Sequence, residues 1–266
     1  MKPLLRCGAC AALLLSLVPA APAVAQDRPL YPAIATGLAI PVGPSAQQRA
    51  SIPARGRHVL VDAASARLFM IEDGQVVDSM RVIVGKPEAA TPVLRSTLYY
   101  ATLNPYWNVP PELARTIIAR KVLKEGPSYL RDRGYEVVSS FIGNPQILDP
   151  EGVDWAAVAA GREIVHVRQR PGPANSMGQM KFGFENDDGI FLHDTPRKEL
   201  FSEAQRNLSN GCVRLEDAPR FARWLMGRDP QVEVTTPEQH VPLPRPVPIT
   251  IAYLDEGARM SLAAAR

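Results

Sequence analysis

The chain has 266 residues, of which 46% are hydrophobic and 21% are charged, and its formal net charge is +3. These values are ordinary for a globular protein and favour neither a disordered chain, a repeat scaffold nor a nucleic-acid-binding protein. The 26 prolines against 18 glycines indicate extended segments, turns and edge strands rather than a helical bundle. With three cysteines in this length, a small domain held together by disulfides is excluded.

Residues 1–25 are typical of a secretory signal peptide. Lys2 and Arg6 give a positive start, residues 9–18 form a short apolar run, and small residues at 23–25 provide a cleavage site. The apolar run is too short to span the roughly 30 Å hydrocarbon core of a bilayer. Two prolines that follow the run argue against a buried N-terminal helix. We therefore expect export to an oxidising compartment and no transmembrane segment after cleavage.

Cleavage would leave 241 residues with 28 basic and 27 acidic side chains, so the apparent basicity largely disappears. That length suits one large or two small domains. Cys7 and Cys10 would leave with the signal peptide, and Cys212 would stay as a lone thiol that cannot form an intramolecular disulfide. Such a cysteine is a reactive thiol, forms an intermolecular disulfide, or is a small buried hydrophobic residue. The neighbouring residues must distinguish these interpretations.

The chain after the signal peptide begins with a predicted flexible leader and continues with strands. Residues 26–56 are rich in proline, alanine, glycine and glutamine without a sustained period. Strand-like runs at 58–71 and 75–85 flank Glu72-Asp73-Gly74, and an Asp-Gly pair between such runs is a strong hairpin signal. Residues 97–103 continue the β pattern.

A helical segment then interrupts the strands. Within residues 111–133, apolar residues recur at helical spacing with arginine and lysine between them. Strand patterns return at 163–168 and 179–184, and residues 189–194 read as a strand followed by a turn. His193 therefore falls at the end of a predicted strand, where functional side chains often emerge.

Two predicted helices, at residues 195–207 and 217–226, enclose a tight connection that contains Cys212. The first opens with Thr-Pro, which is a favourable helix start, and the second places Phe221 and Leu225 one turn apart on an apolar face. The remaining chain is read as three segments: a β run at 231–235, a proline-rich stretch at 237–248 and a hairpin-like segment at 249–262.

Cys212 lies in the sequence Ser209-Asn210-Gly211-Cys212-Val213-Arg214. Gly211 lets a substrate approach the backbone and leaves N–H groups free to point at it. Arg214 adds positive charge and is able to hold a substrate carboxylate through a bidentate contact. These surroundings favour a reactive cysteine over a structural one.

His193 precedes Cys212 by 19 positions, so one helix and its turns could fold back and bring the two side chains together. The imidazole would take the thiol proton, and the resulting imidazolium would stabilise the thiolate. Phe191 lies two residues before His193 and shares its side of the strand, where it either lines a cleft or packs in the core. The other three histidines are expected to be strand or surface residues: His58, His166 and His240.

These residues resemble a known family. A histidine followed after fifteen residues by Ser-Asn-Gly-Cys-Val-Arg is similar to the motif of the L,D-transpeptidase catalytic (YkuD) domain, and the resemblance covers residues 57–254. Four further segments resemble the larger Gram-negative, lid-containing (YcbB-like) members: residues 104–110, 170–175, 181–182 and 193–196. Two departures matter: Asn210 stands where many members have histidine, and the long N-terminal regions of the larger relatives have no counterpart in this sequence, which resembles a nearly stand-alone catalytic domain.

The resemblance implies a fold and a domain organisation. The fold would be mainly β with α, with a β-sandwich or mixed-sheet core, flanking helices and an inserted helical lid. The catalytic domain would cover residues 57–236 with the lid around 111–160, and residues 237–266 would form a proline-rich C-terminal extension with terminal strands. Because the resembling members are Gram-negative, the signal peptide implies a periplasmic protein that acts on the cell wall.

The resemblance also implies a function. The protein would be a peptidoglycan L,D-transpeptidase that forms 3→3 crosslinks between stem tetrapeptides through a Cys212 thioester, with release of D-alanine. His193 would act as base and then acid, oriented by the backbone at Asp194, and the N–H groups of Gly211 and Cys212 would form the oxyanion hole. Substrate contacts are expected from four residues: Ser209, Asn210, Arg214 and Phe191. No metal or organic cofactor is required.

Several alternatives stay open from the sequence. Within the same fold, water as acceptor would give an L,D-carboxypeptidase, and a protein lysine would give lipoprotein anchoring. A sortase-like cysteine transpeptidase or a secreted cysteine protease is opposed by the glycine directly before Cys212 and by the single residue between Cys212 and Arg214. A non-catalytic wall-binding protein would tolerate replacement of Cys212. Covalent addition of a carbapenem to Cys212 is expected only for the transpeptidase.

Overall fold

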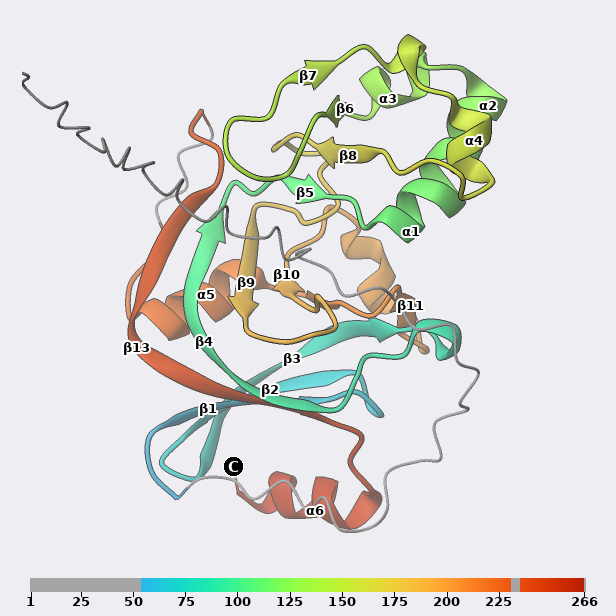
Figure 1. The fold of residues 1–266 in the computed structure, drawn as a ribbon. Helices are drawn as coiled ribbons and strands as arrows, with labels where there is room; N and C mark the ends of the chain where they lie inside the picture. Colours follow the sequence, from blue (N-terminus) through green and yellow to red (C-terminus); the bar gives the residue numbers. More distant parts are fainter. Residues whose placement is uncertain (1–53, 231–234, 266) are drawn as a thin grey trace, which may run out of the picture. The chain divides into compact units, whose positions relative to one another are not determined.

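The computed structural model describes residues 54–230 and 235–265 and is built around two β-sheets (Figure 1). The larger sheet has the strand order β11 (Asn207–Ser209), β3 (Gln75–Gly85), β12 (Val213–Leu215), β10 (Leu192–His193), β9 (Met180–Phe184), β4 (Leu94–Leu103), β13 (Gln239–Ala252), β1 (Arg57–Asp62) and β2 (Arg67–Glu72). Since β2 also pairs with β3, the run of strands closes on itself. The smaller sheet has the order β5 (Trp107–Asn108), β8 (His166–Gln169), β6 (Tyr135–Val138) and β7 (Ile147–Leu148). The predicted fold class, a sheet-dominated structure with few helices, is confirmed.

The first strands follow the sequence pattern closely. Asp73 and Gly74 both have positive φ values, 49° and 80°, which is the backbone conformation that a two-residue hairpin turn requires. They join β2 to β3 in the predicted hairpin. The run predicted at 58–71 is two strands instead of one, because the chain turns after Asp62 and Ala66 takes a positive φ of 51°.

The core of the larger sheet lies between its strands and α5 (Ala218–Met226). We call Phe182, Leu192 and Val213 the core row, because they lie opposite one another on β9, β10 and β12 and all are fully buried. Phe221 of α5 packs edge-on against Phe182 with ring centroids 4.9 Å apart. The helix forms where predicted, with the Asp217 carboxylate capping its start and Gly227 in the left-handed conformation ending it.

The prediction for the segment before Cys212 is wrong. Residues 195–207 do not form a continuous helix, but a short 3-10 helix, Lys198–Ser202, followed by β11. The Thr195 hydroxyl accepts a hydrogen bond from the Arg197 N–H at 3.2 Å, and such a local turn competes with helix formation. Phe201 is anchored in the interior by tertiary packing.

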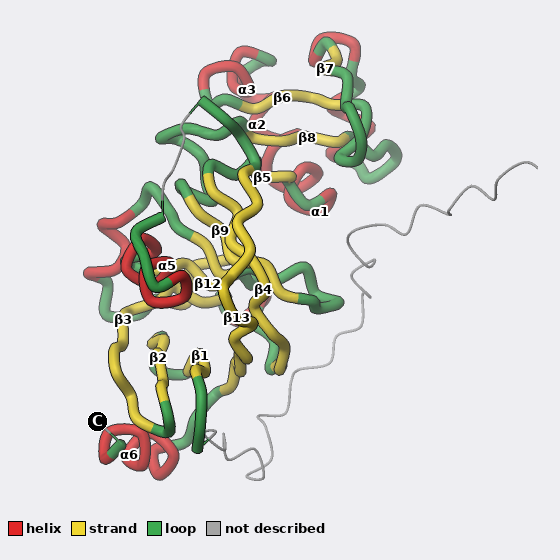
Figure 2. Tube along the Cα trace, turned by 90° about the vertical axis from the view of Figure 1, so that its left-hand side faces the viewer, coloured by secondary structure: helices red, strands yellow, loops and turns green. Residues whose placement is uncertain are grey.

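The C-terminal prediction also needs correction. The proline-rich residues belong to β13, which pairs with β4 along much of its length, and the expected hairpin at 249–262 is the end of β13 followed by α6 (Glu256–Ala264). Figures 1 and 2 show β4 and β13 running side by side. β1 pairs with β13 only from Ile249 onward. Before Ile249, one edge of β13 is therefore unpaired, and the prolines there interrupt no hydrogen bonds to β1. α6 buries Leu262 in an apolar cluster with β1 and β2.

Most of the β run predicted at 231–235 lies outside the described residues, as do residues 1–53.

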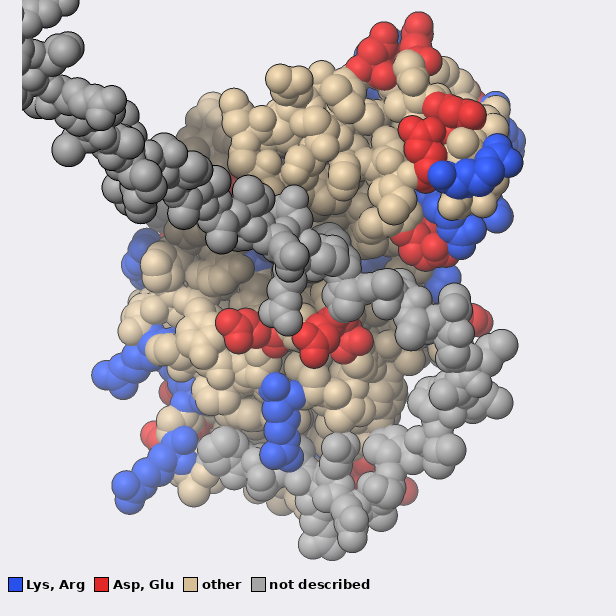
Figure 3. All heavy atoms as spheres, in the orientation of Figure 1, with Lys and Arg blue, Asp and Glu red and all other residues tan. Residues whose placement is uncertain are grey.

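Residues 105–175, which we call the inserted region, have a hydrophobic core of their own. Helical spacing around Ile118 and Val122 is confirmed, but the region is not purely helical, because it also contains the whole smaller sheet. Its helical elements are α1 (Pro111–Leu113), a π-helical turn (Ala114–Ala119), α2 (Arg120–Glu125), α3 (Ser128–Asp132) and α4 (Trp155–Ala159). Figure 3 shows charged side chains of both signs gathered over the helical end of this region. Within the part of the chain that the structure describes, no helix combines the length and apolar character needed to cross a membrane.

Candidate active site

Strand register places the predicted site residues together. His193 on β10 lies opposite Arg214 on β12 and opposite Lys181 on β9. Residues directly opposite on neighbouring strands point to the same face of a sheet, and successive residues alternate. Lys181, His193 and Arg214, which we call the site row, therefore face away from the core row. Cys212 lies two residues before Arg214 and shares its side of the chain.

The backbone around Cys212 requires glycine at position 211. Gly211 has a φ of +116°, a conformation that side chains rarely adopt, and an added Cβ would lie 3.1 Å from Ile190. The Gly211 carbonyl accepts a hydrogen bond of 2.7 Å from the Thr91 hydroxyl, which itself accepts from the Gly85 N–H at 2.9 Å. Thr91 is buried and holds the Cys212 turn from 120 residues away. Sequence reasoning missed this residue because nothing local at Thr91 indicates so distant a partner.

Ser209, which the sequence analysis assigns to substrate contact, closes the same turn from inside. Its buried hydroxyl accepts from the Gly211 N–H at 3.1 Å and donates to the Cys212 carbonyl at 2.6 Å. The Gly211 N–H is therefore occupied and is not the free oxyanion donor expected from the sequence. The Cys212 N–H remains as the backbone candidate for that role.

His193 is almost fully buried, and its Nδ1 atom lies 2.5 Å from the Asp194 carbonyl oxygen. A carbonyl only accepts hydrogen bonds, so Nδ1 carries the proton and Nε2 of the neutral ring is left as the basic atom. This is the backbone contact predicted for Asp194. The Asp194 carboxylate adds support, because it accepts from the Gln179 N–H at 3.0 Å and from Lys198 Nζ at 2.7 Å.

Electrostatics favour neutral forms of both Cys212 and His193. Burial lowers the pKa of His193 to about 4, and the positive charges of Arg214 and Lys181 act in the same direction. Burial raises the pKa of the Cys212 thiol, although a hydrogen bond to the Phe191 backbone and the charge of Arg214 oppose this shift. The thiolate–imidazolium pair expected from the sequence is therefore not the favoured resting state. No hydrogen bond joins the two side chains among the described residues.

The remaining predicted contacts differ in their exposure. Arg214 is partly buried, burial lowers its pKa, and its Nε atom has no hydrogen-bond partner within the described part of the chain. Phe191 is half-buried, lies outside the core clusters, and has Lys181 Nζ 5.8 Å from its ring centroid, which favours the cleft-lining interpretation over core packing. Asn210 is exposed.

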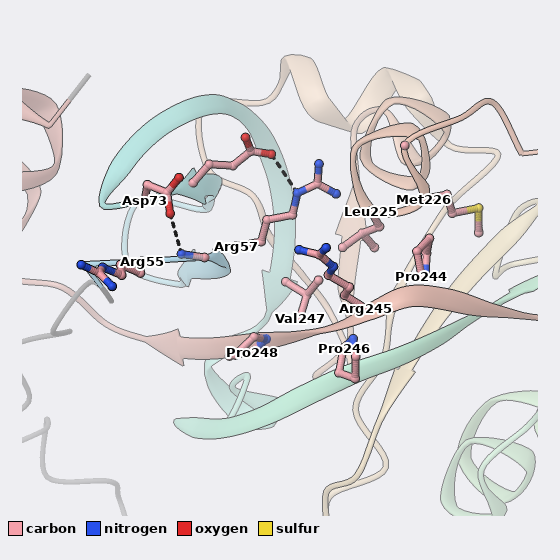
Figure 4. A pocket seen from close by; sticks show the side chains of 13 residues that line it. Arg55, Arg57, Asp73, Leu225, Met226, Pro244, Arg245, Pro246, Val247 and Pro248 are labelled. Carbon is pink, nitrogen blue, oxygen red and sulfur yellow. Dashed lines mark hydrogen bonds and ion pairs between the residues drawn. The ribbon is translucent and has the colours of Figure 1, made fainter.

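A sizeable cavity lies elsewhere in the molecule. A hollow of about 630 Å³ is formed by the start of β1, the β2–β3 turn, the C-terminal end of α5 and residues 244–248 of β13 (Figure 4). Neither Cys212 nor His193 lines it, so the site is identified by its chemistry and not by the size of a cavity. Among residues 54–230 and 235–265, no group of three or more His, Cys, Asp or Glu side chains is placed to hold a metal ion.

Comparison with known proteins identifies the family. Residues 56–247 match the family model of YkuD, the L,D-transpeptidase catalytic domain. A Haemophilus influenzae protein described as an L,D-transpeptidase is 34% identical over 182 residues, which are 68% of this chain and 36% of that protein. This chain thus spans about a third of the length of that relative.

Two solved structures are similar at lower identity. An L,D-transpeptidase from Mycobacterium smegmatis shares 17% identity with a TM-score of 0.34, and the match covers 74% of this chain and 59% of that one. L,D-transpeptidase 3 from Mycobacterium tuberculosis, in complex with a faropenem-derived adduct, shares 11% identity with a TM-score of 0.36, covering 74% and 60%. The family match over most of the sequence confirms the resemblance read from the motif, and the chain belongs to the L,D-transpeptidase catalytic domain (YkuD) family.

Proposed function

We propose that this protein is a peptidoglycan L,D-transpeptidase that forms 3→3 crosslinks through a thioester on Cys212. The observation that carries the proposal is the tautomer of His193, whose Nδ1–H is held by the Asp194 carbonyl so that Nε2 is left as a base on the strand beside Cys212. A buried neutral imidazole on the strand beside a half-buried thiol suits proton transfer that accompanies attack on the substrate.

In the first half-reaction, Cys212 Sγ attacks the carbonyl carbon that joins the third stem residue, at the L-centre of diaminopimelate, to the terminal D-alanine. As the C–S bond forms, the thiol proton passes to His193 Nε2. The C–N bond then breaks, and Nε2 returns that proton to the leaving amine, so D-alanine departs and the acyl group stays as a thioester. The Cys212 N–H supports the negative oxygen of the intermediate.

In the second half-reaction, the side-chain amine of a diaminopimelate on another stem attacks the thioester carbon. Its proton moves to Nε2 and then to the sulfur as the C–S bond breaks. The products are a 3→3 crosslinked dimer and the free thiol, and no redox step or cofactor enters this balance. Arg214, whose Nε has no hydrogen-bond partner among residues 54–230 and 235–265, would hold a carboxylate of the acyl donor.

Two further parts of the proposal concern the setting of the reaction. The sequence of residues 1–25 supports export, so we assign the enzyme to the periplasm. The chain enters and leaves the inserted region near the site row, and there the Asn104 N–H donates to the Gln179 carbonyl at 2.8 Å. We assign it the role of a lid that covers the peptide during reaction.

The test is incubation of the mature protein with purified disaccharide-tetrapeptide, followed by mass spectrometry. A dimer that lacks one D-alanine supports the proposal, provided that Cys212→Ala and His193→Ala both abolish it. A product that is only monomeric tripeptide would assign the protein as an L,D-carboxypeptidase, and equal turnover by Cys212→Ala would rule out the thioester.

A further inference from the structure

Lys181 is the second cationic residue of the site row, and the reaction above gives it no role. Lys181 and Arg214 lie on opposite sides of His193, each one strand away. With neighbouring strands about 4.8 Å apart, the two cationic residues are separated by roughly 10 Å at the backbone. Two positive groups at this spacing match a ligand with carboxylates on both sides of the reacting bond.

Lys181 is held in place beside His193. Its side chain is only 17% exposed, and its Nζ atom lies 3.4 Å from Glu238 Oε1 and 5.8 Å from the Phe191 ring centroid. The separation from Glu238 is long for a charge-assisted hydrogen bond, which is usually about 2.7–2.9 Å. An ammonium has three donors, and Glu238 is the one carboxylate that pairs with Lys181 in the described part of the chain, so Lys181 is able to bind another anionic partner.

Contacts with residues other than Lys181 fix the position of Glu238. The same Oε1 atom accepts a hydrogen bond of 2.6 Å from the Tyr106 N–H, and the Glu238 N–H donates to the Asn104 carbonyl at 3.0 Å. Glu238 also has a positive φ of 54°, which costs energy in a residue other than glycine and is kept only when its surroundings enforce it. Glu238 is therefore a positioning residue that keeps Lys181 on the site face.

The order of the strands gives the direction of the substrate. Arg214 belongs to β12 and Cys212 directly precedes that strand, whereas His193 belongs to the middle strand β10 and Lys181 to β9 on the far side. The acyl carbon must lie at Cys212, and the leaving amine must lie within reach of the His193 proton. Whatever follows the leaving nitrogen therefore extends toward β9. In a tetrapeptide donor, the group that follows is one Cα atom and a free carboxylate.

We propose that Lys181 binds the free α-carboxylate of the leaving D-alanine and so selects donors that end one residue after the reacting bond. This inference rests on the proposed function and adds a specificity-determining residue to it. A donor with one more residue, or with its carboxylate blocked, would place an uncharged group against Lys181 and leave the ammonium without its ligand.

The experiment compares two donors, the disaccharide-tetrapeptide with a free D-alanine carboxylate and the same compound with a terminal D-alanine amide. Release of D-alanine or D-alanine amide is followed at several donor concentrations for the wild type and for Lys181→Met, Lys181→Arg and Glu238→Gln. Lys121→Met is the matched control, because Lys121 is an exposed lysine on α2 that also pairs with a glutamate.

We expect the wild type and Lys121→Met to prefer the free acid by about 10- to 100-fold in kcat/KM, which is the range for losing a hydrogen bond to a charged group. Lys181→Met should lose most of this preference through a higher KM for the acid, and Lys181→Arg should keep it. Glu238→Gln should weaken the preference without abolishing it. The same preference in Lys181→Met as in the wild type would overturn the inference while leaving the proposed function intact. A wild type that processes neither donor would overturn both, and a wild type without any preference would overturn the inference before any variant is made.

Discussion

Two faces of the same three strands differ in what their side chains do. On β9, β10 and β12, the core row buries Phe182, Leu192 and Val213 completely, and α5 covers them. At the adjacent position of each strand, the site row presents Lys181, His193 and Arg214, a buried imidazole between two partly buried cationic residues. The core row stabilises the fold by hydrophobic burial, whereas in the site row burial disfavours the charged forms of His193 and Arg214.

The site row is tolerable because rigid hydrogen bonds surround it. The Asp194 carbonyl holds His193, and Lys198 ties the Asp194 carboxylate to the backbone carbonyls of Leu215 and Glu216. Gly178 contributes by lacking a side chain, since an added Cβ would lie within 2.6 Å of the Asp194 side chain. Burial of the core row thus offsets the free-energy cost of the polar groups buried on the neighbouring face, which is organised for chemistry and not for stability.

The largest expected effect on stability comes from the core row. Phe221→Ala removes the ring that packs on Phe182, and such a truncation in a fully buried position costs about 3–5 kcal/mol. Urea unfolding at neutral pH should measure this loss. Phe191→Ala is the matched variant on the site face, and because Phe191 is half-buried it should cost about 1 kcal/mol or less while slowing acyl transfer. Equal destabilisation by the two variants would contradict the division between the faces.

A smaller effect is expected from the titration of His193. Its pKa is about 4 in the folded protein and about 6.5 when unfolded, so the unfolded chain binds more protons between these values. The contribution of His193 to the free energy of unfolding should therefore be fully present above pH 6.5 and should decrease by about 3 kcal/mol as the pH falls to 4. His193→Gln should remove that part of the pH dependence in urea unfolding curves measured from pH 7.5 to 4.

This comparison needs the His193→Gln difference and not the wild-type curve alone. Burial also lowers the pKa of His58, so His58 destabilises the folded state in the same direction as the pH falls. A His193→Gln variant whose stability falls as steeply as that of the wild type would show that His193 is not buried in its neutral form.

Local signals predicted the elements that depend on local chemistry. The Asp73-Gly74 turn, the apolar face of α5 and the meeting of His193 with the Cys212 strand all follow from residues close in sequence or from a single parallel pairing. The sequence did not indicate that β13 is one long strand. Its prolines are tolerated because they precede the part of β13 that pairs with β1, and no local pattern shows which edge of a strand is open.

The motif named candidate site residues, but it could not show their charge states. The neutral forms of Cys212 and His193 follow from burial on the site face, which depends on tertiary packing. In the same way, Thr91 and Lys181 reach the site through strand pairings and hydrogen bonds that join residues far apart in the sequence. Motif reading named the candidate reactive groups, and the fold decides their charge states and hydrogen-bond partners.

The smallest predicted effect concerns Ser209, which separates positioning from substrate contact. Ser209→Ala leaves the buried Gly211 N–H without its acceptor and the Cys212 carbonyl without its donor, so we expect a loss of about 1–3 kcal/mol in unfolding free energy. Acyl transfer should slow through kcat with little change in KM, because both hydrogen bonds of the hydroxyl lie within the turn. Asn210→Ala is the adjacent control, and as an exposed side chain it should stay within about 0.5 kcal/mol of the wild type. If Ser209→Ala instead raised KM at unchanged stability, the hydroxyl would have to leave the turn and bind the peptide during the reaction.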